Sequence, residues 1–356
     1  MSTAFILAGA GLGGGLYFGN LSYVEASAAP AAAQSTSPPG VQVSPVATLN
    51  DPGGDGIYGI AFTRTGALAA GDLNGSAYLW DVATGTVTGA FPDFNSLGIF
   101  GVAVNPDGTI LAANAINPTY TKGSVVLWDT SGSKPIATLT SPDGQGFGNP
   151  PAFSPDGGTL AAASADGSIY LWNITSGKPV SFSKRLTDPG SQEDFGIAFS
   201  PTTGFLAAAD HNGTAYLWNT KQASVVRTFK DPHSEGMSGV AFSPDGKILA
   251  TGDGNGNVYL WNVSTGSLIT TLYGPEGGYV QSIAFSPRGG IVAATSDNII
   301  GRKYLTYVWD ITGKPLASLQ DPGTAGVTRL AFSPNGSILA VGDENAHIYI
   351  WSMKLA

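Results

Sequence analysis

The chain of 356 residues is 42% hydrophobic and only 12% charged, and its 50 Gly and 23 Pro residues are typical of a β-rich globular protein with many tight turns. Its net charge of -9 and the lack of a Lys/Arg cluster argue against nucleic acid as a partner. Because it has no Cys, the chain has no disulfide, thiolate nucleophile or Cys-bound metal.

The first 44 residues differ from the rest. Residues 3–24 carry no charge and are about long enough to span a bilayer, and residues 26–28 (ASA) have the small-x-small form of a signal-peptidase site. No Lys or Arg precedes the apolar run. We therefore expect residues 1–28 to be a signal peptide or an uncleaved membrane anchor, followed by an Ala/Pro/Ser-rich linker over residues 29–44. Both alternatives predict an extracytoplasmic protein, secreted or membrane-anchored, and a cytosolic protein is the remaining alternative.

The rest of the chain, residues 45–356, repeats one pattern seven times. Seven Trp residues mark the repeats at spacings of 48, 44, 46, 43, 48 and 42 residues, which is the period of a repeated supersecondary unit. These are Trp80, Trp128, Trp172, Trp218, Trp261, Trp309 and Trp351.

Each repeat predicts four short strands. An apolar triplet such as Val240-Ala241-Phe242 leads into a Ser-Pro-Asp-Gly turn, which fits a type I turn. A second apolar run follows, and then a pair such as Asn255-Gly256, which predicts a two-residue hairpin with positive φ at both positions. The third strand ends in Trp, with Tyr two residues earlier on the same face in six repeats. A fourth run, such as residues 135–139 (PIATL), completes the unit.

Seven such units predict an all-β fold, a seven-bladed β-propeller of four-stranded antiparallel blades, because a small sheet with two apolar faces is buried only by neighbours on both sides. Burying one indole stabilises the fold by roughly 4–6 kcal/mol at most, so we expect the Trp residues to be core. The last repeat lacks its fourth strand, and an unattached copy lies at residues 45–49 (PVATL). We predict that this copy pairs with the strand around Trp351 and closes the ring.

The body of the chain resembles the WD40 repeat family, in its bacterial style. The resemblance rests on recurring "AFSPDG", "NG" or "DG", and "YLWN" or "LWD" followed by "TG", with literal WD pairs at Trp80, Trp128 and Trp309. The family often has a Gly-His pair before the first strand, whose His joins a hydrogen-bond network with Ser/Thr, Asp and Trp. This chain has mostly Asp-Pro or Ser-Pro there, so the network must be absent or rebuilt in most blades.

The sequence shows no catalytic, metal or cofactor constellation. The three His residues, His211, His233 and His347, lie in different repeats in or beside turns, where we expect side chains facing solvent. Residues 253–257 (DGNGN) mimic the start of a calcium loop, but Val258 stands where that loop needs Gly. The acidic residues in the Pro loops could converge on one mouth of the channel, although we expect solvated charges: Asp55, Asp143, Glu193, Asp194, Glu235 and Glu276.

Two loops break the repeat and point to a binding face. The segments 114–123 (NAINPTYTKG) and 296–303 (SDNIIGRK) each hold five extra residues, on the same face as the Pro loops. Aromatic residues precede several apolar triplets on that face, and exposed aromatics are plausible anchors for a partner. The alternative is that these rings seal the core between blades. The candidate partner-binding residues are Tyr58, Phe100, Tyr120, Phe195, Tyr279 and Arg302.

The pattern favours a monomeric, non-catalytic scaffold or sensor propeller that binds a protein or peptide. Similar propellers occur as extracytoplasmic sensor regions of membrane-anchored Ser/Thr kinases, and residues 3–24 would then provide membrane anchoring. An enzymatic propeller of the hydrolase or lactonase type, with a site at the channel mouth, is one alternative. A cytosolic structural scaffold is the other.

Overall fold

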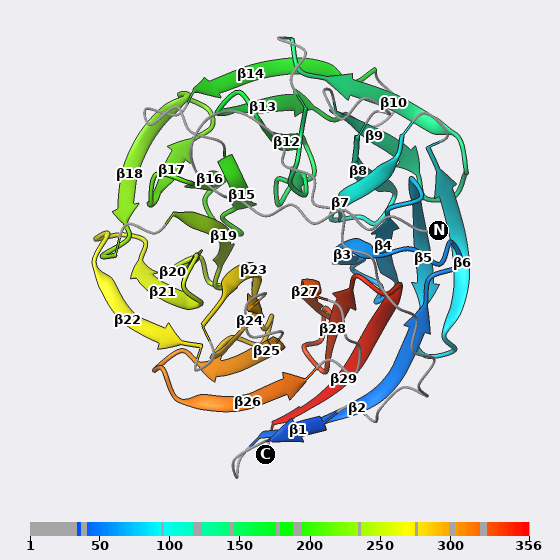
Figure 1. Cartoon of the computed structure of the whole chain (residues 1–356). Coiled ribbons are helices and arrows are strands. Elements are labelled where there is room, and N and C mark those ends of the chain that lie inside the picture. Colours follow the sequence, from blue (N-terminus) through cyan, green and yellow to red (C-terminus); the bar gives the residue numbers. More distant parts are fainter. Residues whose placement is uncertain are drawn as a thin grey trace. The chain divides into compact units, whose positions relative to one another are not determined.

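The structure is a computed structural model that describes residues 34–36, 41–93, 96–116, 123–142, 146–175, 179–187, 194–233, 236–274, 277–298, 303–320 and 326–355. Residues 33–356 form one compact unit. The described strands build seven antiparallel sheets, or blades, arranged around a central opening (Figure 1). The predicted fold class, an all-β seven-bladed propeller, is therefore confirmed. Among the residues that the structure describes, no helix is long and apolar enough to span a bilayer.

Blades 1 to 4 follow one another along the chain. Their strands are β3 (Ile57–Phe62), β4 (Leu68–Asp72), β5 (Ser76–Asp81) and β6 (Thr86–Pro92); β7 (Gly98–Val104), β8 (Ile110–Ile116), β9 (Gly123–Asp129) and β10 (Pro135–Thr140); β11 (Ala152–Phe153), β12 (Thr159–Ser164), β13 (Ser168–Asn173) and β14 (Ser181–Thr187); and β15 (Asp194–Phe199), β16 (Phe205–Asp210), β17 (Thr214–Asn219) and β18 (Ser224–Lys230).

Blades 5 to 7 complete the ring and take in the two N-terminal strands. Their strands are β19 (Met237–Phe242), β20 (Ile248–Asp253), β21 (Asn257–Asn262) and β22 (Leu268–Tyr273); β23 (Tyr279–Phe285), β24 (Ile291–Asn298), β25 (Lys303–Asp310), β26 (Pro315–Gln320) and β1 (Gln34–Thr36); and β27 (Val327–Phe332), β28 (Ile338–Asp343), β29 (His347–Leu355) and β2 (Val41–Asn50).

The core lies between blades rather than within them. Buried apolar side chains form seven clusters, and each cluster joins two neighbouring blades. The seven Trp side chains are 0–4% exposed, which confirms that they are core. Trp261 of β21, for example, packs against Leu217 and Phe229 of blade 4. No blade could bury both of its faces alone. Each blade therefore needs a neighbour on either side, which the closed ring provides.

Ring closure follows the predicted pairing and goes further. Strand β2 pairs antiparallel with β29, and Pro45 lies opposite Trp351. The strand begins at Val41, so the pairing reaches into the stretch expected to be linker. Strand β1 adds a fifth strand to blade 6 by pairing with β26, again from within that stretch. In Figure 1, β1, β2 and β29 lie side by side where the two ends of the ring meet. Backbone hydrogen bonds thus cover edges that would otherwise be open to other chains.

The hairpin turns between second and third strands differ from the prediction. At Asp72-Leu73-Asn74-Gly75, only Gly75 has positive φ (79°), and its N–H donates to the carbonyl of Asp72 at 3.4 Å. The prediction of positive φ at both Asn and Gly was therefore wrong. The turn is a right-handed turn closed by one left-handed glycine, and it is stabilised by the Asp72 carboxylate, which accepts from the Ser76 N–H at 2.8 Å.

The two long loops are shorter than the sequence indicated. Strand β8 continues to Ile116, which pairs with Gly123, and β24 continues to Asn298, which pairs with Lys303. Part of each insertion therefore extends a hairpin instead of forming a loop. Residues 117–122 and 299–302, with Tyr120 and Arg302, lie outside the described residues.

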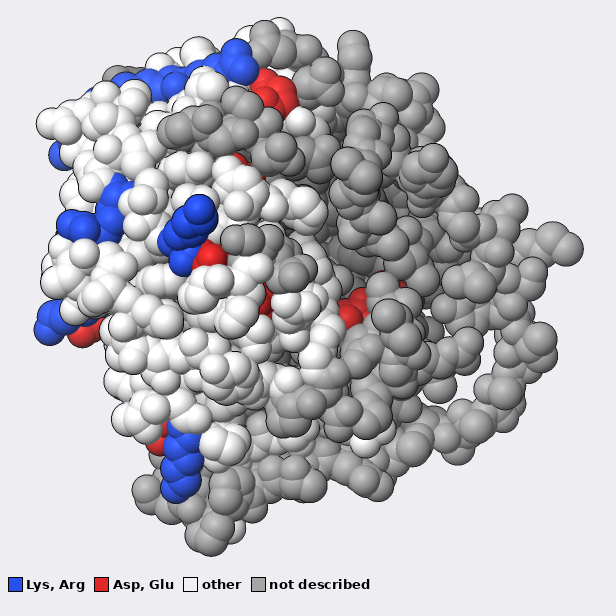
Figure 2. All heavy atoms as spheres, turned by 60° about the vertical axis from the view of Figure 1, so that its left-hand side comes forward, with Lys and Arg blue, Asp and Glu red and all other residues white. Residues whose placement is uncertain are grey.

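Basic side chains on the outer strands tie neighbouring blades together. Arg227 of β18 donates to the carbonyl of Thr265 in blade 5 at 2.8 Å, and Lys184 of β14 donates to that of Thr220 in blade 4 at 3.1 Å. In the view of Figure 2, Lys and Arg side chains lie on the outer side of the ring, with acidic side chains among them. Arg227 and Lys184 therefore bind carbonyl groups at the outer rim of the ring, away from the channel.

Candidate functional site

A recurrent bulge sets the shape of the channel end where the first strands begin, which we call the mouth. The pairing of first and second strands shifts register at this level in six blades. A bulge re-aims the side chains at its site. In blades 1 and 2 the bulged residues are Tyr58 and Phe100, whose half-buried rings lie 5.4 Å apart at an interplanar angle of 50°. The structure thus brings two of the predicted residues into direct contact.

The other predicted residues are less fully placed. Tyr279, half-buried at the start of β23, lies directly opposite Asp297 of β24 in the sheet. Phe195 lies on β15, and its side chain is outside the described part of the chain, as are Tyr120 and Arg302. Of the acidic residues predicted near the mouth, Asp55 is the one whose side chain is described, and it is half-buried.

Two carboxylates that the sequence reasoning missed lie at the mouth. Glu344 follows β28 directly, and Asp297 stands at the equivalent position after Ser296 in blade 6. Their oxygens converge on Gly326: a Cβ at that glycine would lie 3.3 Å from Glu344 Oε1 and 3.5 Å from Asp297 Oδ2. Tyr58 donates its hydroxyl hydrogen to Glu344 Oε1 at 3.1 Å.

The signal for this acidic pair was present in the repeat alignment. The equivalent position in the other blades holds Leu73, Ile116, Ala165, His211 and Gly254, so two acids in adjacent blades depart from the pattern. The mouth thus combines the aromatic pair of blades 1 and 2 with a carboxylate pair of blades 6 and 7.

Burial leaves both carboxylates poorly stabilised in their charged forms. It raises the pKa of Asp297 to about 6, although a hydrogen bond from the Gln281 side chain offsets part of the effect. Burial also raises the pKa of Glu344, and the neighbouring charge of Asp297 adds to that rise, while the Tyr58 hydroxyl opposes it. Burial and the charge of Glu344 together raise the pKa of Tyr58, so this hydroxyl stays a hydrogen-bond donor.

Arg329 forms the floor below the mouth. It extends from β27 and donates to the backbone carbonyl of Gln281 in blade 6 and to Asn149 Oδ1 in blade 3 at 3.4 Å, so it reaches across the central opening. The equivalent positions of the other blades hold only small residues or Pro: Gly59, Gly101, Pro150, Gly196, Gly239 and Ser282. A Cβ on Gly101 would lie 2.4 Å from Pro150 Cα, which shows how closely the first strands approach one another here.

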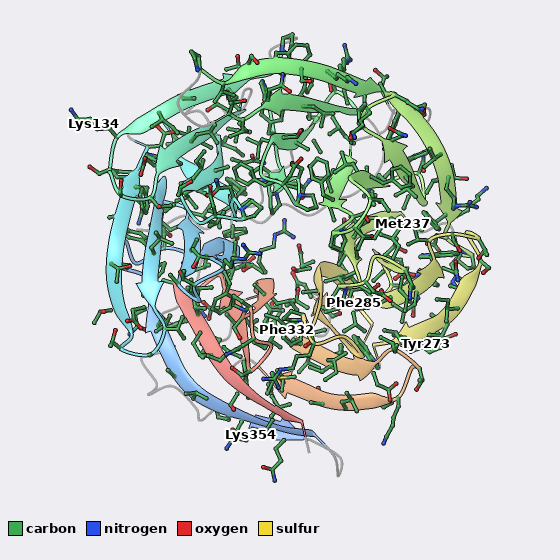
Figure 3. The ribbon with its side chains drawn as sticks, turned by 180° about the vertical axis from the view of Figure 1, so that it is seen from behind. Lys134, Met237, Tyr273, Phe285, Phe332 and Lys354 are labelled. Atoms are coloured by element: carbon green, nitrogen blue, oxygen red, sulfur yellow. The ribbon has the colours of Figure 1, made fainter. Side chains whose placement is uncertain are left out.

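The opposite end of the channel is more apolar. A shallow depression of about 340 Å³ is lined by side chains of blades 1, 6 and 7, among them Phe62, Phe285, Phe332 and Arg64. Figure 3 shows Phe285 and Phe332 close to the central opening, whereas Lys134, Tyr273 and Lys354 lie on the outer side. Because Phe62, Phe285 and Phe332 also belong to the cores between blades, this end is an extension of the packing.

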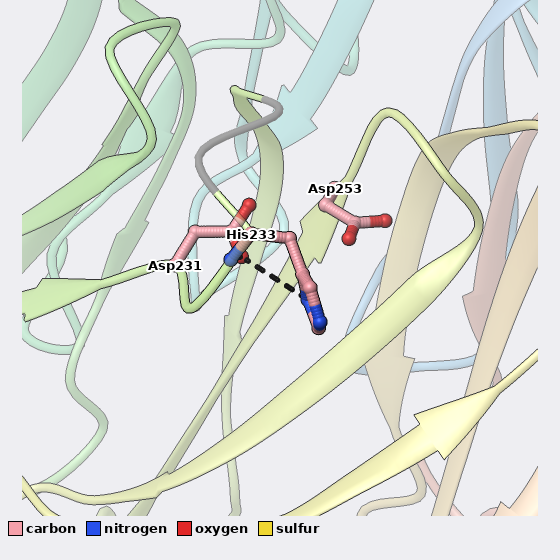
Figure 4. A group of neighbouring side chains, drawn as sticks. All are labelled: Asp231, His233 and Asp253. Atoms are coloured by element: carbon pink, nitrogen blue, oxygen red, sulfur yellow. Dashed lines mark hydrogen bonds and ion pairs between the residues drawn. The ribbon is translucent and has the colours of Figure 1, made fainter.

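One group of side chains has the composition of a metal site. Asp231, His233 and Asp253 each place one ligand atom within 4.8 Å of the others (Figure 4). Asp253 already accepts hydrogen bonds from the N–H groups of Asn255 and Asn257 and from the Asn257 and Tyr259 side chains. His233 Nδ1 lies 2.8 Å from the Tyr259 hydroxyl. Asp253 and His233 Nδ1 are therefore already part of a hydrogen-bond network around the Tyr259 hydroxyl.

Similar hydrogen bonds from Tyr to Asp recur in other blades. The polar network, which we expected to be absent or rebuilt in most blades, is rebuilt around these bonds. Tyr170 donates to Asp166 at 2.6 Å in blade 3, and Tyr349 donates to Asp343 at 3.2 Å in blade 7. In blade 5, Trp261 also donates to Thr251 Oγ1 at 2.9 Å. The Tyr two residues before Trp therefore makes a hydrogen bond to Asp in these blades, where the family network often uses His.

Comparison with known families agrees with this architecture. The family model described as "WD domain, G-beta repeat" matches residues 43–81, 152–173, 188–219, 223–262, 266–300 and 313–352. These segments cover more than half of the chain. The chain belongs to the WD40 repeat family. Blade 2, which lies outside the matched WD40 segments, has the same four-stranded order, from β7 to β10.

Two curated relatives share part of this WD40 propeller. The chain is 33% identical to "Protein LST8 homolog" of Drosophila melanogaster over 110 residues, which is 30% of this chain and 33% of that protein. It is 26% identical to "Autophagy-related protein 16" of Arabidopsis thaliana over 122 residues, or 34% of this chain and 23% of that protein. The matched region spans a third or less of each relative.

Proposed function

We propose that this WD40 propeller is a non-catalytic scaffold or sensor that binds a protein or peptide partner at the mouth. The observation that carries the proposal is the contact at the mouth between the Tyr58–Phe100 ring pair and a carboxylate pair of blades 6 and 7. Tyr is one of the residues enriched at binding hot spots. The family membership supports protein binding, and neither relative's name states an enzymatic activity.

The arrangement favours binding over hydrolysis, the enzymatic alternative from the sequence. A hydrolase of this fold would need acid and base groups free to exchange protons with a substrate. Glu344 is engaged by the Tyr58 hydroxyl, and Asp297 is 8% exposed, so a substrate would have little access to either acid. Arg329 donates to the Gln281 carbonyl and to Asn149 Oδ1, so its positive charge is held in place below the mouth.

Capture of partners from the source cells tests this proposal. The wild-type chain is compared with Tyr58→Ala/Phe100→Ala and with Arg64→Ala, a matched change of an exposed side chain at the opposite end. We expect a partner that the wild type and Arg64→Ala recover and that the double variant loses, with all three proteins equally folded by circular dichroism. Recovery by the double variant but not by Arg64→Ala would instead assign binding to the opposite end.

For localisation, we propose secretion or membrane anchoring through residues 1–28. The support is the uncharged stretch over residues 3–24 and the ASA sequence at 26–28. Cell fractionation with sequencing of the mature N-terminus tests it. We expect a membrane-bound chain, or a secreted chain that begins at residue 29; a cytosolic chain starting at Met1 would refute it.

A further inference from the structure

Two buried carboxyl groups meet beside the loop that leads into the mouth. Asp51 begins this loop, residues 51–56, and Asp72 ends β4 of blade 1. Both side chains are buried, and their carboxyl groups lie within hydrogen-bond reach of each other. Because ionised carboxylates only accept hydrogen bonds, a bond between the two requires a proton on one of them. The pair is therefore a proton-binding element inside the fold.

Blade 5 has the same pair of acids but satisfies it with a tyrosine. There, the Tyr259 hydroxyl interacts with both Asp231 and Asp253 and donates to Asp253 at 2.9 Å. Tyr78 occupies the equivalent position in blade 1 and is half-buried, but its hydroxyl interacts with Ser76 instead of donating to Asp72. The pair in blade 1 thus uses a proton where the pair in blade 5 uses a hydroxyl group.

Few charged groups surround the pair. Asp55 on the loop donates its N–H to Asp51 at 3.4 Å, and Tyr78 faces the pair from β5. On the side of blade 7, His347 forms its ion pair with Asp343. No described Lys, Arg or His forms an ion pair with either acid. Loss of the proton would therefore leave two buried negative charges without compensation.

The loop that begins at Asp51 connects the pair to the mouth. It closes where the Gly56 carbonyl accepts from the Leu73 N–H at 3.2 Å. A Cβ on Gly56 would lie 3.0 Å from Tyr58 Cε2, so the ring of Tyr58 packs closely against the backbone of the loop. Opening of the loop would therefore move the ring that pairs with Phe100 at the mouth.

We propose that the Asp51–Asp72 pair is a proton-controlled latch that holds loop 51–56 closed and so sets the position of the Tyr58 ring. The inference rests on the proposed function and adds its regulation, because partner binding at the mouth would weaken when the latch loses its proton. The closed loop binds a proton that solvated carboxyl groups release near pH 4. Closing is therefore favoured at low pH and becomes less favourable as the pH rises, until the pH reaches the raised pKa of Asp72, about 7.

Amide hydrogen exchange of the full chain at pH 5 and pH 8 tests the latch. The Leu73 amide reports whether the loop is closed. Ala165 is its matched control, because its N–H donates to the Gly146 carbonyl in the same way at 3.0 Å. In that blade, blade 3, Ser141 and Ser164 stand in place of the two acids. With the intrinsic exchange rate divided out, the opening constant should be at least about tenfold larger at pH 8 for Leu73 and should change less than about twofold for Ala165.

Substitution of Asp72 by Asn tests the role of the proton. The Asn side-chain oxygen can still accept from the Ser76 N–H, as Asp72 does. The opening constant at Leu73 should lose most of its dependence on pH in this variant. The Tyr58 ring resonances should shift between pH 5 and pH 8 in the wild type and shift less in Asp72→Asn, where titration of the neighbouring Glu344 still contributes.

Asp51→Ser/Asp72→Ser is the second variant and should behave like Asp72→Asn. It copies the serine pair of blade 3, which shows that this fold accommodates serine at both positions. It therefore tests the latch even if Asp72→Asn folds poorly.

Three results would each overturn the inference: equal opening constants at Leu73 at both pH values, an equal pH response at Ala165, or an unchanged response in the variants. Tyr58 ring resonances that shift equally in wild type and Asp72→Asn would overturn it as well. If Tyr58→Ala/Phe100→Ala still loses the cellular partner in that case, the proposed function stands without the latch. If the latch responds as expected and that double variant keeps the partner, the proposed function fails instead.

Discussion

Replacing Asp72 by Asn tests how a buried acid pair controls the stability of the propeller. Asp72 is 0% and Asp51 7% exposed, and a Cβ on Gly53 would lie 2.5 Å from one carboxylate and 2.9 Å from the other. Burial, with the charge of Asp51, raises the pKa of Asp72 to about 7, and burial also raises the pKa of Asp51. The native state therefore holds a proton that the unfolded chain releases near pH 4.

The sign and size of the effect follow from this difference. Because the native state binds more protons, the free energy of unfolding should fall as the pH rises from about 4 to about 7 and should lose no more from this pair above that range. A rise of about three pKa units corresponds to roughly 4 kcal/mol at most, and proton sharing within the pair should reduce the loss to a few kcal/mol. Asn mimics the protonated acid, so Asp72→Asn should remove most of this slope and be more stable than the wild type at pH 8.

Urea unfolding at pH 5 and pH 8, followed by tryptophan fluorescence, measures these differences. Asp51→Asn should reduce the slope only in part, because burial, the larger cause, still raises the pKa of Asp72 when the charge of Asp51 is gone. A wild-type pH slope that Asp72→Asn leaves unchanged, or a variant less stable than the wild type at pH 8, would refute the reasoning.

Two further predictions use matched positions in different blades. Trp261→Phe should lower the free energy of unfolding by about 1–2 kcal/mol more than Trp128→Phe in urea titrations, because the Trp261 indole donates to Thr251 whereas Trp128 Nε1 has no partner among the described residues; equal losses would contradict the role of that bond. Gly101→Ala should lower stability by about 1–3 kcal/mol because its Cβ would meet Pro150, and Gly148→Ala, with nothing within 4 Å, should be nearly neutral in thermal melts; the reverse order would disprove the close approach of the first strands.

The sequence predicted the parts of the fold that hydrophobic burial determines. Trp spacing reveals seven units because each unit must bury the same large side chain against its neighbour, and the missing last strand near Trp351 reveals the closure by β2. The conformation at Asn74-Gly75 was predicted incorrectly, because the Asp72 side chain stabilises a different turn that the dipeptide alone does not indicate.

The candidate site was harder to predict because it depends on geometry between blades. Tyr58 and Phe100 could be found from their shared position in the repeat. Asp297 and Glu344 are 47 residues apart and come together only because blades 6 and 7 are neighbours in the ring. Arg329 bonds to Asn149 across the opening, a contact that a single repeat does not contain.

The most direct test of the account is a crystal structure of the full chain with a bound peptide from the captured partner. We expect this peptide to lie at the mouth and to contact the rings of Tyr58 and Phe100. A peptide bound at the opposite end beside Phe285, or along an outer strand, would contradict the assignment of the mouth as the recognition surface.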